Sequence, residues 1–461
     1  MSERRRLIVV GGVAAGMSAA ARAKRLEPDL DVTVYERSGH CSYTACGLPY
    51  HVSGVIADHR ALVMRTPDEF ARDGIAVRVR HEVTAIDARA RTLSVRELDG
   101  GRERSESWDA LVLAMGARPA GTDLPGAQLP GTFTLRTIED ARAIRAWIDE
   151  HGARRAVVVG GGYIGLEMAE ALRARDLETT VVEREPRLLT LVDADVAQTI
   201  AAELERQGID VRCGARVEEI AGDARVRRVV ADGEPIAADI VVIGIGVRPD
   251  SGLAAAAGIA LGPHRAIAVD ARMRTSADGV WAAGDCCETR HLLHDGPAWI
   301  PLGTTANKQG RVAGTNVAGG DETFGGVLGT AVVKVCDLEV GRTGLGEQEA
   351  ADAGLDVVGA SITHLSRARY YPGHEPLQVK LVAERGTGRL LGGQLVGREG
   401  VAKRVDVVAG ALHAGATADE LSRYDLSYAP PFAPVWDPVL LAAREAAKAA
   451  AVRGAVGGAR R

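Results

Sequence analysis

One pattern occurs twice in this sequence and constrains the fold more than any other feature. Residues 7–36 and 156–183 each contain a β-branched apolar run, a glycine turn, an Ala-rich helical stretch and a second apolar run that ends in glutamate. This is the pattern of a βαβ unit, in which a helix connects two parallel strands. Two such units predict an α/β chain with two Rossmann-like dinucleotide-binding domains.

The second unit carries the full dinucleotide fingerprint in its glycine turn. Gly160 allows the tight turn, Gly162 lets a pyrophosphate approach the backbone, and Gly165 lets the helix pack closely on the strand. Glu183 ends the next strand, where a carboxylate accepts from a ribose 2′-hydroxyl and repels a 2′-phosphate. We therefore expect NADH to be preferred over NADPH, although two arginines follow the glutamate and weaken this expectation.

The first unit departs from the fingerprint at one position. Gly11 and Gly16 are present, but Val13 stands where the middle glycine is expected. Glu36 ends the second strand in the same way as the glutamate of the other unit, which supports nucleotide binding here as well.

Three further apolar runs are closed by glycines, at residues 110–119, 239–250 and 279–288. The first ends at Gly116 and the last at Gly284-Asp285. Their positions on both sides of the second unit indicate that this unit is inserted between two parts of the first. After about residue 325, strand-like runs separated by turns are followed by amphipathic stretches, which predicts a separate α+β domain.

Composition excludes several classes of function. A formal net charge of -5 gives no reason to expect a nucleic-acid partner. No apolar run reaches the roughly 18 residues that a membrane-spanning helix needs, and no signal-peptide pattern is present, so we expect no membrane association. Six cysteines in 461 residues do not form a disulfide framework, and we therefore expect a cytoplasmic protein.

Two of these cysteines, Cys41 and Cys46, lie close together in "HCSYTACGLPY". A metal site, a disulfide, a catalytic thiol and simple packing are all open from this stretch alone. Zinc is disfavoured because no second cysteine pair at ligand spacing is evident, so we predict no metal.

Nine segments in order along nearly the whole chain resemble one family: GGVAAG, SYTACGLPY, LVLAMGARP, VVVGGGYIGLE, GVWAAGDC, TTANKQGR, YYPG, GREGVAKRVDV and DLSYAPPF. They resemble the FAD-dependent pyridine nucleotide–disulfide oxidoreductases of the single-cysteine branch, and most of all the coenzyme A-disulfide reductase and NAD(P)H persulfide reductase type. The resemblance implies an FAD-binding domain at 1–120 and 247–325, an NAD(P)H-binding domain at 121–246 and a C-terminal dimerisation domain at 326–450. A mobile tail is expected at 451–461.

The resemblance also implies roles for particular residues. Glu36 would bind the adenosine ribose of FAD, Asp285 its ribityl chain, and Thr304 and Ala306 would lie beside its ring system. The full set of expected cofactor-binding residues is Gly11, Gly12, Ala15, Gly16, Glu36, Ala114, Gly116, Gly160, Gly162, Tyr163, Ile164, Gly165, Glu183, Gly246, Gly284, Asp285, Thr304 and Ala306.

Cys46 stands at the position of the family's nucleophile. We expect it to precede a helix that begins near "GLPY", with Pro49 in the first turn, so that the helix N-terminus stabilises the thiolate. Cys41 then fills a small space or pairs with Cys46 in a disulfide. Many coenzyme A-disulfide reductases have Asn immediately before this cysteine, whereas this chain has Ala45, which weakens the expectation of disulfide specificity.

Other expected site residues come from elsewhere in the chain. Tyr370 and Tyr428 match tyrosines that reach the active site from a partner subunit in the family, which implies a homodimer. Ser42 matches a serine near the nucleophile, and Arg22 and Arg25 match positions that contact coenzyme A. Two further basic positions of the coenzyme A site are Gly74 and Trp436 here, so this carrier is less firmly indicated.

The implied function is transfer of electrons from NAD(P)H through FAD to Cys46, and then to a small disulfide or persulfide such as coenzyme A disulfide. Two alternatives stay open. One is an NADH oxidase that reduces oxygen, and the other is a flavoprotein electron carrier in which the cysteines are incidental. Peroxidase activity is disfavoured because the family's histidine in the first glycine turn is Ala14 here.

Overall fold

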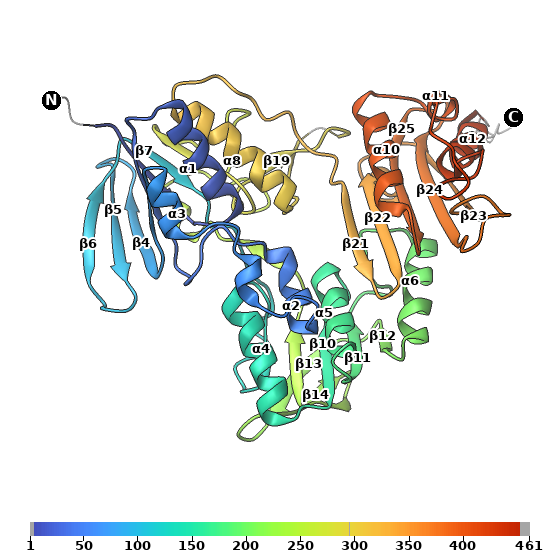
Figure 1. The fold of residues 1–461 in the computed structure, drawn as a ribbon, viewed down its shortest axis with the longest axis horizontal. Helices are drawn as coiled ribbons and strands as arrows, with labels where there is room; N and C mark the ends of the chain where they lie inside the picture. Colours follow the sequence, from blue (N-terminus) through green and yellow to red (C-terminus); the bar gives the residue numbers. More distant parts are fainter. Residues whose placement is uncertain (1–3, 295, 452–461) are drawn as a thin grey trace, which may run out of the picture.

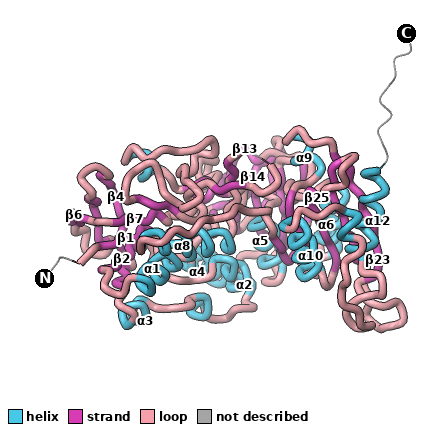
Figure 2. The backbone as a smooth tube through the Cα atoms, turned by 90° about the horizontal axis from the view of Figure 1, so that it is seen from above, coloured by secondary structure: helices cyan, strands magenta, loops and turns pink. Residues whose placement is uncertain are grey.

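The computed structural model describes residues 4–294 and 296–451. Three five-stranded sheets define three lobes, and Figures 1 and 2 show the lobe with β6 and the lobe with α12 at opposite ends of the molecule. The predicted mobile tail lies outside the described residues except for Ala451. These lobes match the predicted α/β class, whereas the domain boundaries stay predictions.

The first sheet is parallel and has the strand order β18-β7-β1-β2-β3. Its strands are β1 (Arg6–Val10), β2 (Asp31–Tyr35), β3 (Ile75–Arg78), β7 (Ala110–Leu113) and β18 (Val280–Ala282). The central strands read as continuous apolar runs because both faces of the sheet are covered. One face carries two helices, and the other carries an antiparallel meander of β4 (His81–Asp87), β5 (Thr92–Glu97) and β6 (Glu103–Ser107).

The helices α1 (Ala14–Leu26) and α8 (Gly303–Val317) pack against each other on the first sheet. A Cβ at Gly310 would lie 2.2 Å from the carbonyl oxygen of Ala15, and one at Gly314 would lie 2.4 Å from that of Ala19. Only glycine therefore permits this approach, which brings the start of α8 to the first glycine turn. The short helices α3 (Pro67–Arg72) and α7 (Gly252–Ala256) complete this lobe.

The second sheet repeats the architecture, with the parallel order β12-β11-β10-β16-β9. Its strands are β9 (Thr132–Phe133), β10 (Arg155–Val159), β11 (Glu178–Glu183), β12 (Asp210–Cys213) and β16 (Ile240–Ile243). Helices α4 (Ile138–His151), α5 (Tyr163–Arg173) and α6 (Ala194–Arg206) belong to this lobe, as does the meander β13 (Val217–Gly222), β14 (Val226–Ala231) and β15 (Glu234–Ala237). The chain enters and leaves it through the antiparallel pair β8 (Ala117–Pro119) and β17 (Val247–Pro249).

The third sheet is antiparallel, with the order β21-β22-β25-β24-β23. Its strands are β21 (Ala331–Val335), β22 (Leu338–Gly344), β23 (Val357–Leu365), β24 (Pro376–Glu384) and β25 (Leu390–Gly397). Its helices are α9 (Glu347–Asp352), α10 (Val401–His413), α11 (Ala418–Leu421) and α12 (Pro438–Ala451). The α+β texture predicted after residue 325 is therefore present, and a short pair, β19 (Thr289–Arg290) and β20 (Pro297–Ala298), precedes it.

Candidate active site

The first glycine turn joins β1 to α1 and is closed too tightly for side chains. A Cβ at Gly11 would lie 2.2 Å from the carbonyl oxygen of Ala114, and one at Gly16 would lie 1.8 Å from that of Gly11. The backbone N–H of Gly12 donates to Oε2 of Glu36 at 2.7 Å, and this carboxylate is buried at the end of β2. The structure thus brings five of the predicted residues, Gly11, Gly12, Gly16, Glu36 and Ala114, together at the carboxyl edge of the first sheet, where α/β sheets bind nucleotides.

Gly284 extends this edge toward α8. It adopts a left-handed φ of 82°, and a Cβ here would lie 2.9 Å from Cβ of Ala15 and 3.4 Å from Cβ of Ala306. The N–H of Gly284 donates to Oε1 of Gln309 at 2.8 Å, whereas the buried Nε2 of Gln309 has no partner among the described residues. Glycines that let a ligand approach the backbone closely, together with the donor Nε2 of Gln309, fit a dinucleotide such as FAD at this edge of the sheet. Thr304 lies exposed in the first turn of α8.

Asp285 is held by an arginine that sequence reasoning missed. Nη2 of Arg136 lies 3.3 Å from Oδ2 of Asp285, and a Cβ at Gly116 would lie 2.7 Å from the same Nη2. The carbonyl of Asp285 accepts from Nε1 of Trp299 at 2.8 Å. Arg136 lies just before α4, so this contact joins the first lobe to the second. No motif in the sequence pairs these positions, which are far apart in the chain.

The second glycine turn joins β10 to α5 and repeats the geometry of the first. A Cβ at Gly165 would lie 1.9 Å from the carbonyl oxygen of Gly160, whereas a Cβ at Gly162 would meet nothing within 4 Å. The open space at Gly162 is where the fingerprint places a pyrophosphate. Tyr163 and Ile164 open α5 beside it, and Gly246 lies between β16 and β17 with a left-handed φ of 97°.

Glu183 occupies the end of β11, as its position in the motif predicts. Its Oε2 accepts from the N–H of Gly161 at 2.6 Å, and its Oε1 accepts from that of Glu185 at 2.8 Å. The two arginines that follow are engaged elsewhere. Arg184 pairs with Glu185 at 2.7 Å, and Nε of Arg187 donates to the carbonyl of Val192 at 3.3 Å.

The segment that carries Cys46 is fixed to the first glycine turn. The N–H of Ser42 donates to the carbonyl of Gly12 at 2.8 Å, and Ser42 adopts a left-handed φ of 48° that is uncommon for a serine. Cys46 lies in a 3-10 turn, Ala45–Gly47, that leads into α2 (Leu48–Ser53), with Pro49 in the first turn as predicted. Because α2 packs on α4 and α5, the exposed Cys46 lies at the junction of the two parallel-sheet lobes (Figure 1).

The expected lowering of the Cys46 pKa is wrong for the protein alone. Burial raises the pKa of Cys46, and the carboxylates of Glu167 and Asp285 raise it further, while Arg136 opposes them. The helix that follows has only six residues, and its amides do not outweigh the loss of solvent around the sulfur. A bound group or substrate that adds positive charge or donors at this sulfur would lower its pKa.

Glu167 is a second residue that sequence reasoning missed. It lies on α5, two positions after the last fingerprint glycine, and burial followed by the charge of Glu170 raises its pKa to about 7. Burial is the main cause that raises the pKa of Tyr50, on α2, and the nearby charges of Glu167, Glu170 and Cys46 raise it further. In the sequence, the one signal for Glu167 is its place in "GLE" directly after the glycine turn. In the structure, its raised pKa suits it to exchange a proton near neutral pH.

A Glu167→Gln substitution is expected to lower the pKa of Cys46, because it removes the negative charge that most opposes the thiolate while leaving burial unchanged. The pH dependence of alkylation of the reduced enzyme by iodoacetamide measures this pKa. Glu205→Gln, on the exposed face of α6, is the charge-matched control and should leave the alkylation profile in place. An unchanged or raised Cys46 pKa in Glu167→Gln would contradict the assignment.

Cys41 is not bonded to Cys46 in this structure, in which all six cysteines are free. Its Sγ is buried and lies 3.5 Å from the carbonyl oxygen of Arg65, and burial raises its pKa to about 11. Cys286 and Cys287 are also buried, next to Asp285. Among the described residues, no group of three or more His, Cys, Asp or Glu side chains could hold a metal ion, and no helix is long and apolar enough to span a membrane.

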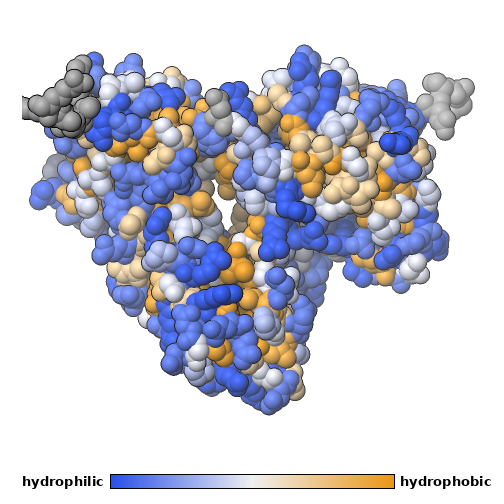
Figure 3. All heavy atoms as spheres, turned by 180° about the vertical axis from the view of Figure 1, so that it is seen from behind, coloured by the Kyte–Doolittle hydropathy of each residue, from blue (hydrophilic) through white to orange (hydrophobic). Residues whose placement is uncertain are grey.

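Four predicted site residues lie away from Cys46. The hydroxyls of Tyr370 and Tyr428 are 2.8 Å apart, on loops next to β23 and α12, which lie far from α2 of the same chain (Figures 1 and 2). Arg22 and Arg25 lie on α1, where Nε of Arg22 donates to Oγ1 of Thr315 at 3.0 Å. The face opposite to that of Figure 1 is hollowed between the two upper lobes (Figure 3).

Two glycine turns, each closed by a carboxylate, and an exposed thiol at their junction define a dinucleotide-dependent thiol oxidoreductase. Family models agree: that of the pyridine nucleotide-disulphide oxidoreductases matches residues 5–310, and that of their dimerisation domain matches residues 330–438. The chain belongs to this family, as the resemblance predicted.

Its relatives include proteins with different named acceptors. The chain is 40% identical over 432 residues, 93% of this chain and 96% of the relative, to an NAD(P)H coenzyme A polysulfide/persulfide reductase of Pyrococcus horikoshii. It is 32% identical to a coenzyme A disulfide reductase of Staphylococcus aureus, over 93% and 96% of the two chains. It is 37% identical to an NADH oxidase of Methanocaldococcus jannaschii, over 92% and 95%. Among solved structures, an NAD-dependent persulfide reductase from A. fulgidus superposes with a TM-score of 0.92 at 40% identity, over 95% of this chain and 82% of that chain.

Proposed function

We propose that this chain reduces a small disulfide or persulfide, coenzyme A-linked in the first instance, through the thiol of Cys46. The chain is a flavoprotein oxidoreductase that draws its electrons from NAD(P)H. The observation that carries the proposal is the position of Cys46, exposed between the first glycine turn and α5 of the second unit. Bound FAD would accept two electrons as hydride from the nicotinamide and pass them to sulfur.

The residues of the first lobe are suited to hold FAD. Glu36 would accept from the adenosine ribose, and the Asp285–Arg136 pair would contact the chain between nucleotide and ring system. Ala306 and Gly284 would allow close approach, with Nε2 of Gln309 as a donor in reach of the same edge. The second turn, with Gly160, Gly162, Gly165 and Glu183, would hold the nicotinamide dinucleotide.

The chemistry at Cys46 follows from thiol–disulfide exchange. The thiolate attacks one sulfur of the substrate, the substrate S–S bond breaks, and the departing thiolate takes up a proton. Cys46 is left in a mixed disulfide, and two electrons that enter from NAD(P)H break that bond and release the second half as a thiol. Glu167, with its pKa near neutrality, is placed to exchange a proton with this sulfur.

NADH is proposed as the preferred donor. The carboxylate of Glu183 would accept from a 2′-hydroxyl and repel a 2′-phosphate, and the arginines that follow it are already paired with Glu185 and Val192. We expect kcat/KM for NADH to exceed that for NADPH by about tenfold or more, which corresponds to roughly 1.4 kcal/mol. A tenfold preference for NADPH in the same steady-state assay would overturn this assignment.

We propose a homodimer formed through the third lobe, which would carry Tyr370 and Tyr428 to the Cys46 of a second copy. Large exposed apolar side chains gather on the same loops: Tyr370, Tyr371, Tyr428, Phe432, Val435 and Trp436. The loops are tied together by the buried Arg404, which pairs with Asp437 at 2.9 Å and donates to the carbonyls of Ser366 and Phe432. A phenol delivered in this way could protonate the departing thiolate.

A substrate panel tests the proposed function. NADH oxidation is followed anaerobically with coenzyme A disulfide, coenzyme A persulfide, inorganic polysulfide and cystine, and in a separate arm with oxygen alone. A kcat/KM at least about a hundredfold higher for one sulfur substrate than for oxygen supports the proposal. The reverse order would assign the chain to the oxidases, as its relative from Methanocaldococcus jannaschii suggests.

A further inference from the structure

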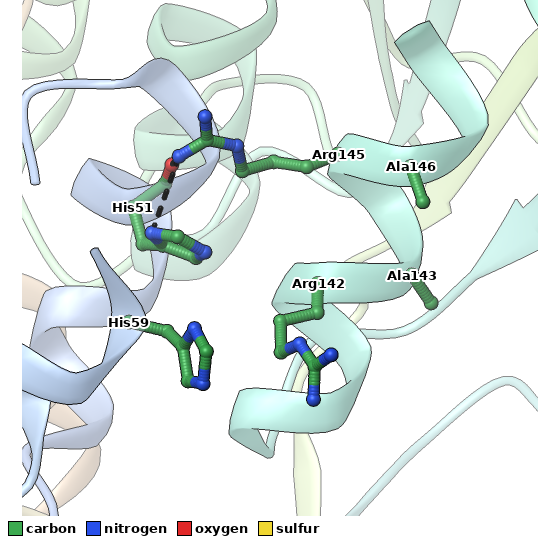
Figure 4. A pocket seen from close by; sticks show the side chains of 6 residues that line it. All are labelled: His51, His59, Arg142, Ala143, Arg145 and Ala146. Atoms are coloured by element: carbon green, nitrogen blue, oxygen red, sulfur yellow. Dashed lines mark hydrogen bonds between the residues drawn. The ribbon is translucent and has the colours of Figure 1, made fainter. Parts of the chain in front are cut away.

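A pocket outside the active site is lined by two arginines, two histidines and two alanines. Its lining residues are His51, His59, Arg142, Ala143, Arg145 and Ala146, and its volume is about 520 Å³. His51 comes from α2 and His59 from the short 3-10 turn after it, while the two arginines come from α4 of the second lobe (Figure 4). The four polar side chains converge from two segments that lie far apart in the sequence.

The two arginines of this pocket are not neutralised by carboxylates. Within 4 Å, neither Arg142 nor Arg145 has a carboxylate partner in the described part of the chain. Nη1 of Arg145 donates to the carbonyls of His51 and Ala57, at 3.0 and 3.2 Å. These contacts fix the guanidinium in place without removing its charge, which an arginine retains at every accessible pH.

The two histidines line the pocket beside these arginines. Nδ1 of His51 lies 2.8 Å from the carbonyl oxygen of Ile56 and 3.3 Å from Nη1 of Arg145, and Nε2 takes no part in either contact. Burial lowers the pKa of His59, and the charge of Arg142 lowers it further. Repulsion of this kind is relieved when an anion enters between the groups.

Besides Arg142, three titratable groups act on His59: Asp58, His40 and His51. On its own segment, Asp58 attracts it from 3.7 Å but is shared with Arg60 at 2.7 Å. His40, whose ring centroid is 5.9 Å away, is paired with Glu139 of α4 at 3.0 Å. His51 faces it from α2 at 5.9 Å between ring centroids.

We infer that this pocket, formed by His51, His59, Arg142 and Arg145, binds a dianionic oxyanion, either free phosphate or sulfate or the phosphate group of a small nucleotide. The two guanidinium groups supply donors of the kind that recognise tetrahedral oxyanions, and an imidazole adds donors on both of its nitrogens when it is protonated. The pocket lies at the C-terminal end of α2, the helix that follows Cys46. Arg145 lines the pocket and donates to the carbonyl oxygen of His51 on this helix. An occupant would therefore contact the helix that follows the thiol without entering the active site.

The test follows the imidazole signals of the flavin-loaded protein, labelled selectively at histidine, during titration with sodium sulfate at constant ionic strength. Sulfate keeps its two negative charges from about pH 6 to about pH 8. Any change of sulfate affinity over this range therefore reflects protonation of the protein and not of the ligand. We expect saturable movement of the His59 signal, a higher His59 pKa with sulfate bound, and binding at least about threefold tighter at the lower pH. Absence of saturation beyond a sodium chloride control would overturn the inference.

Variants make the test specific. Arg142→Gln is expected to weaken sulfate binding at least about fivefold, because it removes one of the two fixed charges. Arg228→Gln, at an exposed arginine of β14, is the charge-matched control and should bind as the parent does. Equal affinity in both variants would overturn the assignment, and calorimetry on His59→Gln gives an independent check that does not use the His59 signal.

A third arm separates the sources of the anion. The dissociation constants of AMP and of phosphate are both read from the His59 signal. If AMP binds at least about tenfold more tightly than phosphate, and Arg142→Gln removes that difference, the occupant is the phosphate of a nucleotide. If AMP and phosphate bind alike, the occupant is the free anion. If neither moves the His59 signal, no oxyanion binds here.

Discussion

A Cys46→Ser variant is expected to lose reduction of small disulfides by at least about a thousandfold in kcat. A serine hydroxyl fits the same space in the turn before α2, but it ionises far less readily than a thiol and cannot form a mixed disulfide. The glycine turns, Glu36 and Glu183, which we propose to bind the cofactors, are unchanged in this variant. Reduction of the bound FAD by NADH, followed by its absorbance in the absence of a sulfur substrate, should remain within about threefold of the parent.

The matched control for this experiment is Cys41→Ser, five positions earlier in the same segment. Cys41 is buried, its pKa is raised to about 11, and it is not bonded to Cys46, so its loss should leave turnover within a few-fold of the parent. A large loss of turnover in both variants would indicate that the two cysteines act as a pair. Unchanged turnover in Cys46→Ser would remove Cys46 from the reaction.

A Lys380→Met variant is expected to lose about 3–5 kcal/mol of stability. Lys380 lies on β24 of the third sheet with only 8% of its side chain exposed, and its Nζ lies 3.1 Å from Asp193, 3.0 Å from Asp195 and 2.5 Å from Glu347. Burial alone would lower the pKa of Lys380, but these three carboxylates raise it above its usual value. Methionine would leave them clustered without a cation.

The effect should appear between lobes, because Asp193 and Asp195 belong to the start of α6 whereas Lys380 and Glu347 belong to the third lobe. Gln394 adds a direct contact, with its Nε2 2.9 Å from Oδ2 of Asp193. A fall of several degrees in the thermal midpoint of the flavin-loaded protein is the expected result. Lys448→Met, which breaks an exposed pair with Glu445 on α12, is the control and should cost at most about 1 kcal/mol. Equal midpoints for the two variants would show that the cluster around Lys380 contributes little.

Local patterns predicted the elements that bind nucleotides, because each depends on residues close in sequence. The close approach at Gly165, where a Cβ would lie 1.9 Å from the carbonyl oxygen of Gly160, is set by residues of the fingerprint itself, whereas Gly160 is closed from outside the fingerprint by the carbonyl oxygen of Gly244 at 2.6 Å. Even the first turn, in which Val13 replaces a glycine, has its two flanking glycines closed against carbonyl oxygens. The family and the choice of FAD came from motif order, whereas the third lobe was predicted from the strand-like runs and amphipathic stretches after about residue 325.

Long-range proximity is what the sequence could not supply. Arg136 and Glu167 carry no motif of their own that places them near Cys46, and their contacts depend on how α4 and α5 pack on α2. The direction of the Cys46 pKa was predicted wrongly for the same reason. A helix N-terminus can be inferred from "GLPY", whereas the burial and the carboxylates that outweigh it are tertiary effects.

The central claim is that substrate sulfur becomes bonded to Cys46, and the most direct test is to trap that bond. The enzyme is reduced with one equivalent of NADH without oxygen, mixed with the small disulfide preferred in the panel, quenched in acid and analysed by intact-mass and peptide mass spectrometry. We predict one substrate half per chain, on the peptide that contains Cys46 and reversed by a reductant. Turnover without any adduct on Cys46, or with the adduct on the other exposed thiol, Cys213, would contradict the account.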